Sequence, residues 1–202
     1  MPKQPAKKPT TVLLVRHGQT PTTGDVLPGR AKGLHLSDRG REQAERAAEK
    51  VAPSKATAVY ASPLERGRET AAPIAKTLGL KVAVERGLLE CDFGDWTGGK
   101  LKQLAKTPEW KTVQRYPSGF RFPNGESFRE MQARIVDTLG RLAEKHHGET
   151  IVCVSHADPI KAAVADALGT HLDLFQRIVI SPCSITTVVY GDGGPMVLGV
   201  NA

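Results

Sequence analysis

The sequence contains few of the residues that mark several common protein classes. Its three cysteines are widely spaced and form no CxxC pair, so neither a disulfide framework nor a zinc knuckle is indicated. Aromatic residues make up 5% of the chain and do not interleave with the basic residues, which argues against a stacking platform for nucleic acid. No apolar run reaches the roughly 18 to 20 residues that a membrane-spanning helix requires. These absences predict a cytoplasmic protein with neither nucleic acid nor membrane as its partner.

The composition that remains is typical of one globular domain. Apolar residues make up 40% and charged residues 24% of a chain of 202 residues, enough for a single large core. Residues 1–10 hold three lysines and three prolines but no apolar run that could serve as a signal-peptide core, so we expect a flexible basic tail. Residues 11–202 then form the domain. The net charge of +7 is compatible with binding to nucleic acid, with binding to a small anion, or with a solvated surface alone, and by itself it does not distinguish among them.

Predicted strands and helices alternate along most of the chain. Strands are expected where short apolar, β-branched runs occur, at residues 11–15, 57–61, 81–84, 151–154, 177–180, 184–190 and 196–200. Helices are expected at residues 39–52 after Ser37, at 62–78 with Ser62 as cap, at 127–147, and after Asp158. Such alternation predicts an α/β fold, a three-layer α/β/α sandwich with a mostly parallel central sheet.

The segment near residues 100–125 has a weak pattern. Pro108, Pro117 and Pro123 interrupt it, which favours short helical pieces over a core element. Long irregular segments of this kind often cover a binding site. We therefore expect a lid.

Charged and polar residues stand at the ends of three predicted strands. Arg16 and His17 end the first, residues 62–66 follow the second, and Ser155 and His156 end the strand at 151–154. In open α/β sheets, ligands bind beyond the carboxyl ends of the strands. These residues should therefore converge at one edge of the sheet.

Four motifs in series give this arrangement a family resemblance. They read LVRHGQT at 14–20, SPLERGRETA at 62–71, ECDFGDWTG at 90–98 and VSHAD at 154–158. Their types and order resemble the histidine phosphatase superfamily, also called the phosphoglycerate-mutase-like family. The resemblance covers nearly the whole chain and implies a metal-independent phosphoric monoester hydrolase that needs no cofactor.

The resemblance also implies roles for individual residues. His17 would be the nucleophile that carries the phosphoryl group, and Glu90 the general acid and base. Arg16, Arg66 and His156 would bind phosphate. Arginine suits this task because its planar fork donates two parallel hydrogen bonds and keeps its charge near neutral pH.

The sequence departs from the family pattern after His17. Gln19 stands where glutamate is common, and PTTG occupies the region of a phosphate-contacting asparagine. Thr22 or Thr23 could supply the missing contact through a hydroxyl, and Thr23 is the candidate that we select. The compact ECDFGDWTG segment favours a phosphatase over a mutase, and a small phosphorylated metabolite as the partner.

Several alternatives stay open at this point. Arg68 competes with Arg66, although the two should face different directions on a helix, and the SxxxR spacing from Ser62 favours Arg66. Trp96 could pack under the acid loop or stack on substrate. A phosphoglycerate-mutase-like phosphomutase could use the same pocket, and a binding protein without activity could keep the same fold. The resemblance suggests a homodimer, and the sequence leaves the substrate open.

Overall fold

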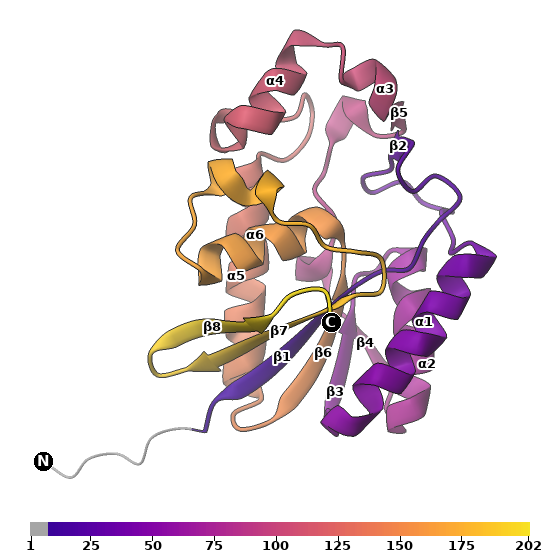
Figure 1. Cartoon of the computed structure of the whole chain (residues 1–202), viewed down its shortest axis with the longest axis vertical. Helices are drawn as coiled ribbons and strands as arrows, with labels where there is room; N and C mark the ends of the chain where they lie inside the picture. The colour runs from indigo at the N-terminus through magenta and orange to yellow at the C-terminus, as the bar shows by residue number, and fades with distance from the viewer. Residues whose placement is uncertain (1–7) are drawn as a thin grey trace, which may run out of the picture.

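The computed structural model describes residues 8–202, and a six-stranded sheet lies at its centre (Figure 1). The strand order is β4-β3-β6-β1-β7-β8. Its first four strands are parallel, whereas β7 pairs antiparallel with β1 and β8 pairs antiparallel with β7. The strands are β1 (Thr10–Arg16), β3 (Ala58–Ala61), β4 (Val82–Val84), β6 (Thr150–Ser155), β7 (Ile185–Gly191) and β8 (Gly194–Gly199).

Helices cover both faces of this sheet (Figure 1). On one face lie α1 (Asp38–Val51) and α2 (Glu65–Leu78), and on the other α5 (Phe128–Lys145) and α6 (Ala157–Ala167). The connections contain the short helices η1 (Ala52–Ser54), η2 (Arg86–Leu88), η3 (Gly94–Trp96), η4 (Pro117–Gly119) and η5 (Leu172–Arg177). The predicted three-layer α/β/α sandwich with a mostly parallel sheet is thus confirmed.

Side-chain alternation along the central strands builds the two halves of the core. In β1, Val12 and Leu14 pack toward α5 and α6, whereas Leu13 and Val15 pack toward α1 and α2. Neighbouring residues of a strand point to opposite faces, so one continuous apolar run serves both layers. Each fully buried side chain of this kind stabilises the fold by roughly 1.5–3 kcal/mol.

Serine side chains cap α1 and α5. Ser37 caps α1 by accepting a hydrogen bond from the Gly40 N–H, and Ser127 begins α5 with a capping box. The prediction that Ser62 caps the next helix is wrong, because α2 begins at Glu65. The Ser62 hydroxyl lies 2.8 Å from Nε2 of His156 instead.

The predicted strand at residues 177–180 is also wrong. The 3-10 helix η5 extends to Arg177, and the following residues form no ladder. Their carbonyls accept hydrogen bonds from side chains, Ile180 from Arg16 at 2.6 Å and Val179 from Asn201 at 2.6 Å. An apolar run alone does not make a strand when its backbone has other partners.

Beyond the carboxyl ends of the parallel strands, a small substructure lies at the top of Figure 1. It contains α3 (Leu101–Leu104), α4 (Pro108–Arg115) and a two-stranded sheet of β2 (Val26–Leu27) and β5 (Gly99–Lys100). Trp96 packs against Trp110 of α4 and against Phe120 and Phe122, with ring centroids 6.3, 5.5 and 5.4 Å away. The expected short helical pieces are therefore present, and the lid role of this segment stays a prediction.

Two predictions concern the chain's ends and surroundings. Most of the expected basic tail, residues 1–7, lies outside the described residues, and Thr10 already belongs to β1. Among residues 8–202, no helix combines the length and apolar character needed to cross a membrane.

Candidate active site

Strand ends and one helix start bring the predicted site residues together. In the parallel pairing of β1 with β6, Arg16 lies beside Ser155, so the next residues, His17 and His156, leave the sheet side by side. Their ring centroids are 5.0 Å apart. Arg66 enters from the first turn of α2, whose N-terminal end favours anions. The expected convergence at the carboxyl edge of the sheet is therefore present.

His17 is held in one tautomer. Its side chain is buried, and Nδ1 lies 2.7 Å from the Gly18 carbonyl oxygen. A carbonyl can only accept, so Nδ1 carries the proton and Nε2 keeps its lone pair. Arg66 Nε lies 3.4 Å from Nε2, on the side to which that lone pair points. This orientation suits nucleophilic attack by Nε2.

Close backbone packing fixes the turn that follows His17. A Cβ on Gly18 would lie 2.5 Å from the Gly40 carbonyl oxygen, and a Cβ on Gly40 only 2.0 Å from that of Gln19. Only glycine permits this approach. The Gly18 N–H also donates to Thr70 Oγ1 at 3.0 Å, and that hydroxyl donates to the Arg66 carbonyl at 2.7 Å. Thr70 therefore ties the histidine turn to the helix that carries Arg66.

Burial and positive charge keep both histidines neutral. Burial, together with the charges of Arg66 and Arg16, lowers the pKa of His17 to about 3. Burial and the charge of Arg66 also lower the pKa of His156 well below its ordinary value. At neutral pH His17 is therefore an unprotonated imidazole and keeps the lone pair that a nucleophile needs.

The two arginines form a buried positive centre. Arg66 is fully buried, with Nη2 donating to the Gly29 carbonyl at 2.7 Å, and Arg16 Nη1 donates to Ile180. Within residues 8–202 neither guanidinium forms a salt bridge. Buried polar atoms without a hydrogen-bond partner there include Arg16 Nε, Arg66 Nη1 and His156 Nδ1. Unsatisfied buried donors and charge are costly, and an anion bound here would compensate them.

Glu90 also belongs to this cluster, and its carboxyl can gain or lose a proton near neutral pH. It is buried in the loop after η2, and its Oε1 accepts a hydrogen bond from the Cys91 N–H at 2.9 Å. Burial, followed by the negative charge of Asp158, raises the pKa of Glu90 to about 7. Such a carboxyl can donate a proton and later accept one at neutral pH.

The sequence of residues 12–202 matches the histidine phosphatase superfamily (branch 1). The chain belongs to this superfamily. A bifunctional protein of Mycobacterium tuberculosis is 32% identical over 196 residues, which cover 96% of this chain, but the chain spans only 54% of that relative's length. Phosphoserine phosphatase 1 of Hydrogenobacter thermophilus is 28% identical over 94% of this chain and 91% of its own length. A mycobacterial glucosyl-3-phosphoglycerate phosphatase has a similar structure, with a TM-score of 0.87 and 25% identity over 96% of this chain and 100% of its own.

The structure also describes the surroundings of two other residues that the sequence analysis considered, Arg68 and Thr23. Arg68, the rival of Arg66, is exposed, as expected for residues that face different directions on a helix. Thr23 lies in the loop after β1, where its hydroxyl accepts a hydrogen bond from the Thr20 N–H at 2.9 Å. That hydroxyl also lies 3.0 Å from the Thr20 hydroxyl, so it shapes the loop.

Sequence reasoning did not identify several residues that surround Glu90. Arg30 and Arg134 both donate to the Glu90 carbonyl, at 2.9 and 3.4 Å, and Glu126 forms salt bridges with both. Glu126 lies in the PNGES segment at residues 123–127, directly before α5. The two arginines come from a loop and from α5, and no motif marks them.

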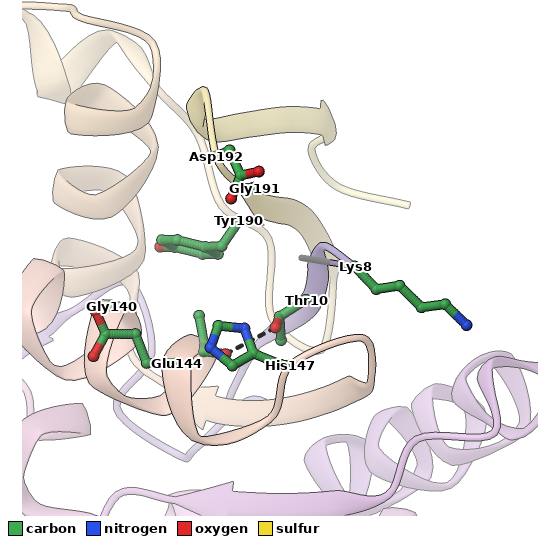
Figure 2. A pocket seen from close by; sticks show the side chains of 9 residues that line it. Lys8, Thr10, Gly140, Glu144, His147, Tyr190, Gly191 and Asp192 are labelled. Atoms are coloured by element: carbon green, nitrogen blue, oxygen red, sulfur yellow. Dashed lines mark hydrogen bonds between the residues drawn. The ribbon is translucent and has the colours of Figure 1, made fainter. Parts of the chain in front are cut away.

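A surface pocket of about 270 Å³ lies far along the sheet from this cluster (Figure 2). Its lining includes Glu144 and His147 at the end of α5, and Tyr190 and Asp192 at the β7–β8 turn. Thr10, the first residue of β1, donates across it to the Ala143 carbonyl at 2.8 Å. None of the unpartnered buried polar atoms found in residues 8–202 lines this pocket.

Metal-binding side chains do not gather elsewhere in the described part of the chain. Residues 8–202 contain no group of three or more histidine, cysteine, aspartate or glutamate side chains placed to hold a metal ion. All three cysteines are buried, and burial raises the pKa of each thiol.

Proposed function

We propose that this protein is a phosphomonoesterase that hydrolyses small phosphorylated metabolites through a phosphohistidine at His17. The observation that carries the proposal is the buried cluster of a neutral histidine, whose unprotonated Nε2 accepts a long hydrogen bond from Arg66 Nε, beside two arginines that form no salt bridge within residues 8–202. A phosphoryl group would supply the missing negative charge and place phosphorus near the nucleophile.

The first half-reaction uses His17 and Glu90. Nε2 of His17 attacks phosphorus and forms a P–N bond while the P–O bond to the leaving group breaks. Glu90 gives its proton to the departing oxygen, so that an alcohol leaves instead of an alkoxide. The result is phospho-His17 and an ionised Glu90.

The second half-reaction restores both residues. The Glu90 carboxylate takes a proton from water, whose oxygen attacks phosphorus as the P–N bond breaks. The electron pair returns to Nε2 and the proton stays on Glu90, so the enzyme returns to its starting state. Throughout, Arg16, Arg66 and His156 would hold the phosphoryl oxygens, and Thr23 remains a further candidate ligand.

Charge is the reason that this scheme needs no metal or other cofactor. Arg16 and Arg66 would neutralise the phosphoryl oxygens from a buried position, where electrostatic interactions are stronger than in water. They also disfavour protonation of His17. The same two side chains would therefore bind the substrate and keep the nucleophile active.

The relatives support hydrolysis but give different substrates. One is a phosphoserine phosphatase and one a glucosyl-3-phosphoglycerate phosphatase, so the shared chemistry is cleavage of an alkyl phosphate monoester. We place the enzyme in the cytoplasm, where such metabolites occur. The segment near 100–125 would act as the lid that selects among them, and a homodimer remains our expectation.

A screen of phosphate release tests the proposal. Phosphoserine, 3-phosphoglycerate and p-nitrophenyl phosphate are incubated with the protein, with and without a chelator, and free phosphate and isomerised ester are both measured. We expect free phosphate in either condition. Isomerised ester in excess of free phosphate would identify a mutase, and no turnover of any ester would identify a binding protein.

A further inference from the structure

Two arginines converge on the main chain of Glu90 from opposite parts of the sequence. Arg30 Nε donates to the Glu90 carbonyl at 2.9 Å, and Arg134 Nη2 approaches the same oxygen at 3.4 Å. Arg134 Nη1 also donates to the carbonyls of Gly87 and Leu89, at 2.8 and 2.9 Å. The backbone that leads to Glu90 is thus fixed at three carbonyls, those of Gly87, Leu89 and Glu90.

Glu126 joins the two arginines. Its carboxylate accepts from Arg134 Nε at 2.8 Å and from Arg134 Nη2 at 2.9 Å, the paired geometry that suits a guanidinium. Arg30 Nη2 donates to Glu126 Oε2 at 3.0 Å, and the Asp92 N–H donates to the same oxygen at 3.2 Å. The Glu126 N–H in turn donates to the Asp92 carbonyl at 2.8 Å. These bonds fasten the loop on the other side of Glu90.

The contacts of Arg30 leave it little capacity to bind substrate. Its three guanidinium nitrogens donate to the Glu90 carbonyl, to Asp92 at 3.3 Å and to Glu126. This differs from Arg66, whose Nη1 has no partner in the described chain. Arg30 therefore supports the loop, whereas Arg66 can receive an anion.

The Glu90 carboxyl itself has few restraints. Within residues 8–202 it accepts a hydrogen bond from the Cys91 N–H, the adjacent residue of the same loop. A local bond of this kind moves with the loop and does not fix its place relative to His17. The position of the carboxyl relative to the reacting oxygen therefore depends on the loop backbone.

We propose that Arg30 and Arg134, bridged by Glu126, are positioning residues that hold Glu90 where it can protonate the leaving oxygen. This inference rests on the proposed function, because it gives these residues a part in the same reaction. They act through Glu90 and do not contact the phosphoryl group.

The test is the dependence of each variant on the leaving group. Arg30→Gln, Glu126→Gln and Arg134→Lys are compared in single-turnover phosphorylation of His17. The alkyl ester is whichever of phosphoserine and 3-phosphoglycerate the enzyme turns over faster, and the second substrate is p-nitrophenyl phosphate. The nitrophenyl ester leaves as a stabilised phenolate that scarcely needs a proton. We expect at least about a tenfold loss for the alkyl ester and less than about threefold for the nitrophenyl ester, since general acid catalysis contributes roughly 10²–10⁴.

Arg46→Gln is the matched control. Arg46 pairs with Glu42 along α1 at 3.8 Å, and both side chains are exposed. It should leave both rates unchanged. A variant that only lowers the folded fraction would reduce both rates equally, so the ratio of the two separates positioning from stability. Arg30→Gln and Glu126→Gln keep the test valid if Arg134→Lys fails to fold.

A double-variant cycle completes the experiment. If Arg30 acts through Glu90, then adding Arg30→Gln to Glu90→Gln should produce little further loss with the alkyl ester. Equal losses for both esters in all three single variants, or additive losses in the double variant, would overturn the inference. Neither result would affect the proposed function, which fails if the unaltered protein releases no phosphate or forms more isomerised ester than free phosphate.

Discussion

The polar side chains at the two ends of the central sheet differ in their hydrogen-bond partners. At the carboxyl end, Arg16, Arg66 and His156 have buried nitrogens without partners in residues 8–202. At the amino end, no such atom found in the described residues lines the pocket of about 270 Å³ in Figure 2, and the hydroxyl of Thr10 donates to the main-chain carbonyls of Ala143 and His146. Unsatisfied buried charge, and not the presence of a hollow, therefore locates the chemistry of this molecule.

The largest effect should follow from removing the nucleophile. His17→Ala should lower the rate of phosphate release by at least about 10⁴-fold, because no neighbouring group can replace attack by Nε2. His147→Gln, at the amino-end pocket, should change the rate less than about twofold, since a distant surface site contributes no transition-state interaction. Steady-state assays of phosphate release measure the rates of both variants. Comparable losses in the two would mean that the chemistry is not confined to the carboxyl end of the sheet.

The next effect concerns two arginines of one helix. Arg66→Ala should cost roughly 2–4 kcal/mol in transition-state stabilisation, because a buried donor to the phosphoryl group is lost. Arg68→Ala should cost much less, since Arg68 is exposed. The ratio kcat/KM measured for each variant gives these energies. The reverse order would mean that Arg68 binds phosphate.

The pH dependence of activity should distinguish the role of Glu90 from that of His17. Glu90 acts protonated, so activity with an alkyl ester is present below its pKa of about 7 and falls as the pH rises through that value. His17 acts neutral, so activity persists as the pH falls and is lost only toward its pKa of about 3. The profile of kcat/KM reports these groups in the free enzyme. Glu90→Gln should remove the alkaline limb, and its survival in that variant would assign the limb to another group.

The smallest effect is expected at Thr23. Its hydroxyl forms hydrogen bonds within the loop. Thr23→Val should therefore weaken the free energy of phosphate binding by about 1 kcal/mol, the usual contribution of one hydrogen bond. Phosphate inhibition constants of the variant and the parent protein give the difference. A loss as large as that for Arg66→Ala would make Thr23 a direct phosphate ligand.

The sequence predicts those features that follow from local patterns. Apolar runs mark the central strands, and a strand's end fixes where its next residue lies, which is why the convergence of His17 and His156 could be expected. Helix geometry predicts that Arg66 and Arg68 face different directions, and the SxxxR spacing from Ser62 selects Arg66. These predictions need no knowledge of distant contacts.

Other features depend on contacts between distant segments. Ser62 has the composition of a helix cap, but its hydroxyl lies 2.8 Å from His156, which is 94 residues away. Arg30 and Arg134 meet at Glu90 because a loop and α5 pack together, and neither arginine belongs to a motif. Residues 177–180 have strand-like composition but lack a neighbouring strand. Local propensity cannot predict such partners.

The central claim is that the phosphoryl group passes through His17. Rapid quenching of the enzyme mixed with ³²P-labelled substrate, followed by peptide mapping at high pH, tests it most directly. The account predicts label on the His17 peptide, stable in base and lost in acid, as expected for a phosphoramidate. Label that survives acid, or that lies on another residue, would contradict it.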